Sequence, residues 1–257
     1  ATLDRFVSTA AESAIVLPVP EPADGRFKML DGREIRILVN TEHDAIYRRA
    51  ERSGATGVGL YRSESLFNRY RGFPNEKDQL EAYRRMVAAA NGEQVNIRLF
   101  DVSADLLLDQ NKNVEKNPAL GLRGVRLGLT RTNVLRPQLR AMLRAADGDQ
   151  IGIIIPLISD VGEIRSVRRF VEKETTALRK KGVVCGSPRI GAMIETPAAV
   201  FMIDEILDEV DFISLGTNDL VQYTLAVDRD NENVSSWFKT LHPAVLRSVK
   251  TVLSAAS

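Results

Sequence analysis

The chain has 257 residues, 44% of them hydrophobic, which is enough for one large domain with a substantial core. Its 35 Lys and Arg residues nearly balance its 34 Asp and Glu residues, and a formal net charge of +1 favours neither nucleic acid nor a membrane surface as a partner. A lone cysteine, Cys185, excludes a disulfide within the chain, and no apolar run approaches the roughly 20 residues of a membrane-spanning helix. We expect a soluble cytoplasmic protein.

Prolines mark the first part of the chain as an extended connector. Pro18, Pro20 and Pro22 each fix their own φ and bias the preceding residue away from the helical region. We therefore expect residues 1–27 to form an N-terminal extension and linker, and residues 28–257 to form the folded domain.

Short apolar runs alternate with longer amphipathic segments after the connector, a pattern typical of parallel strands joined by helices. Six such units can be counted. The apolar runs are rich in Ile, Val, Leu or Phe, as strands covered on both faces require. The predicted strands are Glu34–Val39, Gly57–Arg62, Val95–Asp101, Ile151–Ile158, Ile190–Glu195 and Asp211–Gly216.

Two helices are predicted from the spacing of apolar residues. In Glu163–Lys181 the apolar side chains can share one face, and Ser159 or Asp160 can cap the helix start. The segment Asn133–Ala146 has similar spacing, but Pro137 is compatible with a helix only in the first turn. That helix is therefore predicted to restart just before this proline.

Several predicted strands end in charged or polar side chains. In a (β/α)8 barrel, functional groups lie where strands end and loops begin, all on one face. The residues in question are Tyr61 and Arg62 on the second strand, Arg98 and Asp101 on the third, Glu195 on the fifth, and Asn218 and Asp219 after the sixth. Any one of them could be an ordinary polar strand end that meets solvent. Together they indicate a site at one rim.

The types of these residues suggest a metal and an anion. Glu195 and Asp219 are a suitable pair for Mg²⁺, which takes one or two carboxylates and completes its shell with water and substrate oxygens. A guanidinium group keeps its charge and can donate two parallel hydrogen bonds to a phosphate or carboxylate. The candidate arginines are Arg62, Arg98, Arg123 and Arg229.

Four separated blocks of the sequence stand out: Gly54–Arg62, Asn117–Gly124, Met193–Ala199 and Ser214–Arg229. They resemble the phosphoenolpyruvate-binding C-terminal domain of the enzyme I family, the phosphoenolpyruvate-protein phosphotransferases of the bacterial sugar phosphotransferase system. The likeness extends from about Met29 to Ser257. Because the blocks are separate and occur in the family's order, this resemblance is far more specific than one short motif.

The resemblance implies an α/β fold of the TIM-barrel (β/α)8 type and an Mg²⁺-dependent reaction. In the family, a phosphoryl group moves from phosphoenolpyruvate (PEP) to a histidine on another domain and then to an HPr-type phosphocarrier protein, and the enzyme is a homodimer. By resemblance, the PEP-binding residues are Arg62, Arg98, Arg123, Asn218 and Arg229, and the metal ligands are Glu195 and Asp219.

The sequence departs from the family pattern at several points. Leu106 stands where a substrate-binding lysine is expected, and the family's catalytic cysteine aligns beyond Ser257. His43 and His242 each precede a predicted helix and are expected to have structural or surface roles, so no catalytic residue is predicted in this chain.

With about six of eight βα units, the barrel is expected to be incomplete at its C-terminus. Its first and last strands would then keep exposed edges, which recruit partners or aggregate unless they are covered. Three explanations remain open: a longer parent protein, coverage by the N-terminal tail, and exchange between protomers.

Other functions also remain open at this stage. Pyruvate phosphate dikinase and PEP synthase share the barrel and its metal carboxylates, and a citrate lyase β-like enzyme would use Mg²⁺ on a similar barrel to stabilise an enolate. Leu106 and Ser65 are also compatible with a non-catalytic module that senses PEP or only dimerises. The segment Leu241–Ala244 is closer to the nitrogen-related branch of the enzyme I family.

Overall fold

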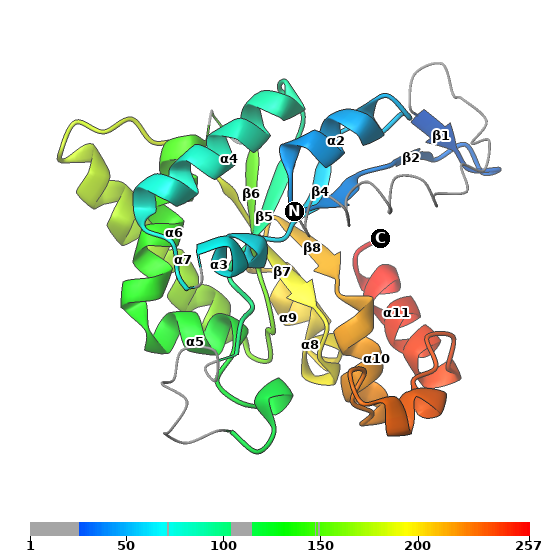
Figure 1. Ribbon diagram of the computed structural model, residues 1–257. Helices are drawn as coiled ribbons and strands as arrows, with labels where there is room; N and C mark the ends of the chain where they lie inside the picture. Colours follow the sequence, from blue (N-terminus) through cyan, green and yellow to red (C-terminus); the bar gives the residue numbers. More distant parts are fainter. Residues whose placement is uncertain (1–25, 71, 104–114, 147, 149) are drawn as a thin grey trace, which may run out of the picture.

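Six parallel strands form a curved sheet in which the strands lie side by side in chain order (Figure 1). The computed structural model describes residues 26–70, 72–103, 115–146, 148 and 150–257. The strands are β3 (Val39–Thr41), β4 (Val58–Tyr61), β5 (Val95–Arg98), β6 (Ile151–Ile155), β7 (Arg189–Ile194) and β8 (Phe212–Leu215). This sheet confirms the prediction of an α/β barrel-type fold with six βα units.

Helices follow the strands and cover the sheet. Figure 1 shows α4, α6 and α7 together on one side of the sheet, and α10 and α11 packed against each other on the other side of the view. The described helices are α2 (Asp44–Glu51), α3 (Glu64–Tyr70), α4 (Glu76–Ala90), α5 (Gly124–Thr130), α6 (Thr132–Ala145), α7 (Val161–Arg179), α8 (Pro197–Phe201), α9 (Ile203–Leu207), α10 (Thr217–Leu225) and α11 (Pro243–Ala255), with short 3-10 helices η2 (Pro118–Leu120) and η3 (Glu232–Trp237).

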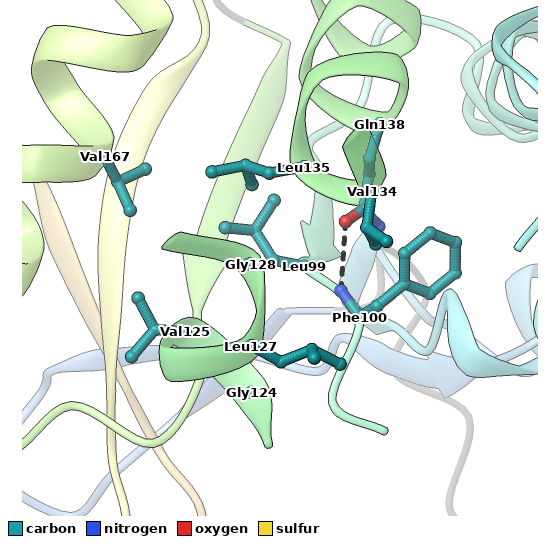
Figure 2. A pocket seen from close by; sticks show the side chains of 10 residues that line it. All are labelled: Leu99, Phe100, Gly124, Val125, Leu127, Gly128, Val134, Leu135, Gln138 and Val167. Carbon is teal, nitrogen blue, oxygen red and sulfur yellow. Dashed lines mark hydrogen bonds between the residues drawn. The ribbon is translucent and has the colours of Figure 1, made fainter. Parts of the chain in front are cut away.

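The core lies where the central strands meet the outer helices. All five residues of β6 are buried, as expected for a strand covered on both faces. Figure 2 shows a small apolar pocket in this core, to which α6 contributes Leu135 and α5 contributes Leu127. The polar side chain that lines it belongs to Gln138, and both atoms of its amide group are hydrogen-bonded within the protein. Oε1 accepts a hydrogen bond from the Phe100 backbone N–H at 3.0 Å, and Nε2 donates to Ser63 Oγ at 3.0 Å. This pocket is therefore part of the core packing.

The first strand of the barrel lies later in the chain than predicted. Glu34–Arg36 forms β2, which pairs antiparallel with β1 (Arg26–Lys28) in a separate two-stranded sheet. All three residues of β2 are exposed, so they lack the buried face of a barrel strand. Val39–Thr41 pairs with β4 instead, and Thr41 is buried in that sheet. The other five strands overlap their predicted ranges.

The two predicted helices both form, but the start of α6 was predicted wrongly. It begins at Thr132 and continues through Pro137. The missing proline N–H leaves the Asn133 carbonyl without its helical donor, but Asn133 is exposed and water can replace that donor. Val134 and Leu135, before the proline, are buried in the core and hold this first turn in place.

The start of α7 confirms Asp160 as its cap. Asp160 Oδ1 accepts a hydrogen bond from the Gly162 N–H at 2.6 Å. In return, Glu163 Oε2 accepts from the Asp160 N–H at 3.1 Å, which completes a capping box. Two backbone donors that have no partner inside the helix are satisfied in this way.

Candidate functional site

A polar pocket lies at the carboxyl ends of the sheet strands, and all seven residues predicted from the sequence line it. These are Arg62, Arg98, Arg123, Glu195, Asn218, Asp219 and Arg229. Strands β4, β5, β7 and β8 each contribute side chains at or just after their ends. The lining residues that were predicted at strand ends lie together because the carboxyl ends of parallel strands meet at one edge of the sheet, whereas Arg123 and Arg229 come from the segments before α5 and after α10.

Three carboxylates lie together in this pocket. Oxygen atoms of Asp101, Glu195 and Asp219 are all within 4.8 Å of one another, and Glu195 and Asp219 are only 2% and 4% exposed. The sequence marked Asp101 as a polar strand-end residue but did not include it with the metal carboxylates. Three buried carboxylates this close together are unfavourable unless cations compensate their charge.

The chain around Glu195 places its carboxylate firmly. Oε1 accepts a hydrogen bond from the Leu157 N–H at 2.7 Å, and Leu157 has a φ of 57°, a conformation uncommon for a residue with a side chain. A Cβ at Gly216 would collide with the Glu195 side chain, so only glycine fits there. Burial, followed by the negative charges of Asp101 and Asp219, raises the pKa of Glu195 to about 8.

Arginines neutralise the other two carboxylates. Arg123 donates from Nε to Asp101 Oδ1 at 3.0 Å and from Nη2 to Asp101 Oδ2 at 2.8 Å, and the same Nη2 lies 3.3 Å from Asp219 Oδ2. Arg229 Nη1 donates to Asp219 Oδ1 at 3.0 Å, and Arg98 Nη1 lies 3.7 Å from Asp101 Oδ2. Three of the four predicted arginines thus meet the carboxylate cluster directly.

The remaining predicted residues lie at the edge of the pocket. Arg62 has a side chain that is 47% exposed, and its Nη2 pairs with Glu42 Oε1 at 2.7 Å, away from the cluster. Asn218 is exposed in the first turn of α10. Both side chains are accessible to a ligand that enters from solvent.

Two residues next to the pocket were missed by the sequence analysis. Glu64, at the start of α3, accepts hydrogen bonds from Arg98 Nε and from the Asp101 backbone N–H. Tyr223, on α10, donates its hydroxyl to the Ala119 carbonyl at 2.5 Å and accepts from Arg123 Nη1 at 3.3 Å. Glu64 follows Arg62 by only two positions, and this proximity was an available signal.

The other residues that the sequence analysis singled out do not line the pocket in the part of the chain that the structure describes. Leu106 is outside the described residues. Cys185 is half-buried in the loop before β7 and donates to the Val183 carbonyl at 3.5 Å. His43 and His242 each occupy the residue before a helix, as predicted, and His242 Nδ1 accepts from the Ala244 N–H at 3.2 Å. Across the described part of the chain, every helix is too short or too polar to span a bilayer.

The family model and the sequence relatives of this chain agree on one family. The family model for the PEP-binding domain of PEP-utilising enzymes matches residues 23–257. Phosphoenolpyruvate-protein phosphotransferases from Haemophilus influenzae and Cupriavidus necator are each 41% identical to this chain, over 88% and 89% of it and 40% of their own length. A protein of Escherichia coli named for the phosphoenolpyruvate-dependent phosphotransferase system is 36% identical, over 97% of this chain and 33% of its own. The chain thus spans well under half the length of these relatives.

The solved structures that align with this chain are more distant in sequence. A macrophomate synthase aligns with 86% of this chain and 67% of its own at 15% identity, with a TM-score of 0.47. A citrate lyase from Burkholderia xenovorans aligns with 68% of this chain and 47% of its own at 17% identity, with a TM-score of 0.42. Similarity at this level says nothing about function.

Proposed function

Because the chain belongs to the PEP-utilising enzyme family and corresponds to the PEP-binding domain of these enzymes, we propose that the strand-end pocket binds PEP together with Mg²⁺. The observation that carries the proposal is the arrangement of opposite charges in the pocket. The carboxylates of Asp101, Glu195 and Asp219 lie within 4.8 Å of one another, and arginines surround them. Such a site offers hard oxygen ligands to a cation and guanidinium groups to an anion.

The carboxylates are suited to a divalent cation. Mg²⁺ is bound by oxygen ligands, usually one or two carboxylates plus substrate oxygens. Burial, followed by the charges of Asp101 and Asp219, raises the pKa of Glu195 to about 8, and a divalent cation in the cluster would favour its ionised form. We propose Glu195 and Asp219 as the ligands, with Asp101 beside them. When bound, Mg²⁺ would withdraw charge from the oxygens of the phosphoryl group.

The arginines are suited to the anionic groups of PEP. Arg123 and Arg229 each pair with a carboxylate of the cluster through 2.8–3.0 Å contacts. When Asp219 binds a cation, Arg229 Nη1 and Arg123 Nη2 lose their contacts with it and can donate to phosphate and carboxylate oxygens instead. Arg62 and Asn218, which are more exposed, are proposed to complete the PEP contacts from the rim. Binding of the metal and binding of PEP should therefore favour each other.

For the whole protein we propose the reaction that the relatives' names describe, PEP-protein phosphotransfer. The pocket would hold PEP and offset charge on the transferring group, so its contribution is positioning and electrostatics. The phosphoryl group would pass to a histidine on another domain and then to an HPr-type carrier. We also propose that the protein acts in the cytoplasm as a homodimer. Membership of this family favours phosphotransfer over the lyase alternative.

Isothermal titration calorimetry with PEP tests the proposed site. We expect the chain to bind PEP with Mg²⁺ and to bind it far more weakly with EDTA. Arg229→Ala removes a charged donor and should weaken PEP binding by roughly tenfold to a hundredfold. Arg165→Ala is the matched control, because Arg165 is exposed on α7 and pairs with Glu209. If the wild-type chain shows no Mg²⁺-dependent binding of PEP, the proposal is wrong.

A further inference from the structure

Glu64 lies behind the pocket and contacts two of its residues at once. It is the first residue of α3, and its side chain is 17% exposed. One oxygen, Oε1, accepts from Arg98 Nε at 3.1 Å and from the Asp101 backbone N–H at 2.9 Å. Glu64 does not line the pocket itself. A single carboxylate oxygen therefore joins an arginine of the proposed anion site to an aspartate of the carboxylate cluster.

Glu64 contacts only the Nε edge of the Arg98 guanidinium group, so its bond does not use the terminal nitrogens. Glu64 is bonded to the Nε edge, and Arg98 Nη1 faces Met193 Sδ and Asp101 Oδ2, both at 3.7 Å. Asp101 belongs to the carboxylate cluster, so its pairing with Arg98 changes if the cluster binds a cation. Glu64 lies outside that cluster. Its bond to Nε can persist while the terminal nitrogens bind an anion.

The second oxygen of Glu64 indicates that this residue is not placed for stability alone. Oε2 is buried and has no hydrogen-bond partner among the described residues. A buried carboxylate oxygen without a partner is costly, and native structures contain few such groups. Burial raises the pKa of Glu64, against the opposing effect of Arg98. A glutamate kept in this position despite that cost is expected to have a role at the site.

We propose that Glu64 is a positioning residue, whose carboxylate holds the Arg98 guanidinium and the Asp101 backbone so that the anion and metal parts of the pocket keep a fixed relative position. The proposal rests on the proposed function, since it assigns PEP to Arg98. The backbone of Arg98 has separate support, because Ser63 Oγ donates to its carbonyl at 2.7 Å. Variants of Glu64 should therefore still fold.

Three variants separate the two contacts of Glu64. In Glu64→Gln the amide oxygen can still accept from the Asp101 N–H, but the ion pair with Arg98 is lost. We expect its Kd for PEP to rise about tenfold, with less than about a threefold change in Mg²⁺ affinity. Glu64→Ala loses both contacts and should weaken both ligands. Glu64→Asp keeps the charge and should recover part of the PEP affinity.

A spectroscopic readout tests positioning independently of affinity. The Nε–H group of Arg98 should give a protected NMR signal in the wild-type chain, assigned by its loss in Arg98→Lys. We expect this signal to shift and exchange faster with water in Glu64→Gln, because the hydrogen bond to Oε1 is replaced by a weaker contact. A glutamate that only stabilised the fold would change the melting temperature and leave the Kd for PEP at its wild-type value.

Glu174→Gln is the matched control. Glu174 is also buried, on α7, and it accepts from Arg136 Nε at 2.9 Å and from Arg140 Nη1 at 3.4 Å, away from the pocket. It should lose stability and keep the wild-type Kd for PEP. Wild-type Kd and an unchanged Arg98 signal in Glu64→Gln would overturn the inference. If the wild-type chain does not bind PEP, the proposed function is wrong. The Arg98 signal can still be compared between the two proteins, and an unchanged signal in Glu64→Gln would overturn the positioning role of Glu64.

Discussion

Glu195 connects the electrostatics of the pocket to the stability of the protein. Its pKa is raised from 4.5 to about 8, first by burial and then by Asp101 and Asp219. Between these two pH values the folded state binds a proton that the unfolded state has released. The free energy of unfolding must therefore fall as the pH rises through this window.

This linkage predicts a pH-dependent effect of Mg²⁺. The metal binds the ionised carboxylate and competes with the proton, so the rise in melting temperature on adding Mg²⁺ should be larger near pH 8.5 than near pH 6. In Glu195→Gln, the metal-free protein should lose less stability over the same interval than the wild-type chain. Thermal unfolding in EDTA and in Mg²⁺ measures both effects. Identical pH slopes for the two proteins would contradict this assignment.

Tyr223 is the second residue at which a small change is informative. Its hydroxyl joins the Ala119 carbonyl to Arg123 Nη1. Tyr223→Phe keeps the ring and removes this bridge, so we expect a loss of about 1 kcal/mol in the free energy of unfolding and weaker binding of PEP. Urea unfolding and calorimetry measure the two quantities. Tyr70→Phe, at a position 45% exposed on α3, should change neither.

Several of the site residues predicted from the sequence lie at or just after strand ends, whereas the two that were missed lie on helices. Arg98, Glu195 and Asp219 follow apolar runs whose ends are visible in the sequence, and all three line the pocket. Glu64 and Tyr223 act from helices, and their contacts join residues 37 and 104 positions apart, to Asp101 and Ala119. No local pattern marks such contacts, because they depend on how the helices pack against the strand ends.

Among the elements, α7 was predicted most completely, and its cap gives a clean test. Asp160 bonds the Gly162 N–H, and Glu163 completes the capping box. Asp160→Ala should lower the free energy of unfolding by about 1 kcal/mol and leave PEP binding unchanged. Urea unfolding measures the change. Glu172→Ala removes an exposed acidic residue from the same helix and should stay within about 0.5 kcal/mol of the wild type. Equal stability losses in both variants would contradict a capping role.

The two wrongly predicted elements share one cause. Pro137 and the run Glu34–Val39 were assigned from local preferences alone. Packing decided both: buried residues before the proline keep α6 intact, and the exposed residues Glu34–Arg36 pair in a hairpin instead of the barrel. Tertiary contacts override local preference in this way wherever the preference is weak.

At the scale of the whole molecule, the order of the sheet accounts for the site. Strands β3 to β8 pair in sequence and all run parallel, so segments from Asn40 to Arg229 converge on one rim. In the described part of the chain, β3 and β8 each pair with one neighbour only, which agrees with the six-of-eight count expected from the sequence. The alternation of strands and helices sufficed to predict this architecture, because it limits the topologies that connect parallel strands.

A crystal structure of the chain with Mg²⁺ and PEP tests the central claim most directly. We predict one ion in contact with the carboxylates of Glu195 and Asp219, with PEP beside it and its phosphate contacted by Arg98, Arg123 and Arg229. An ion or a PEP molecule bound elsewhere, with the arginines still paired to Asp101 and Asp219, would contradict the account.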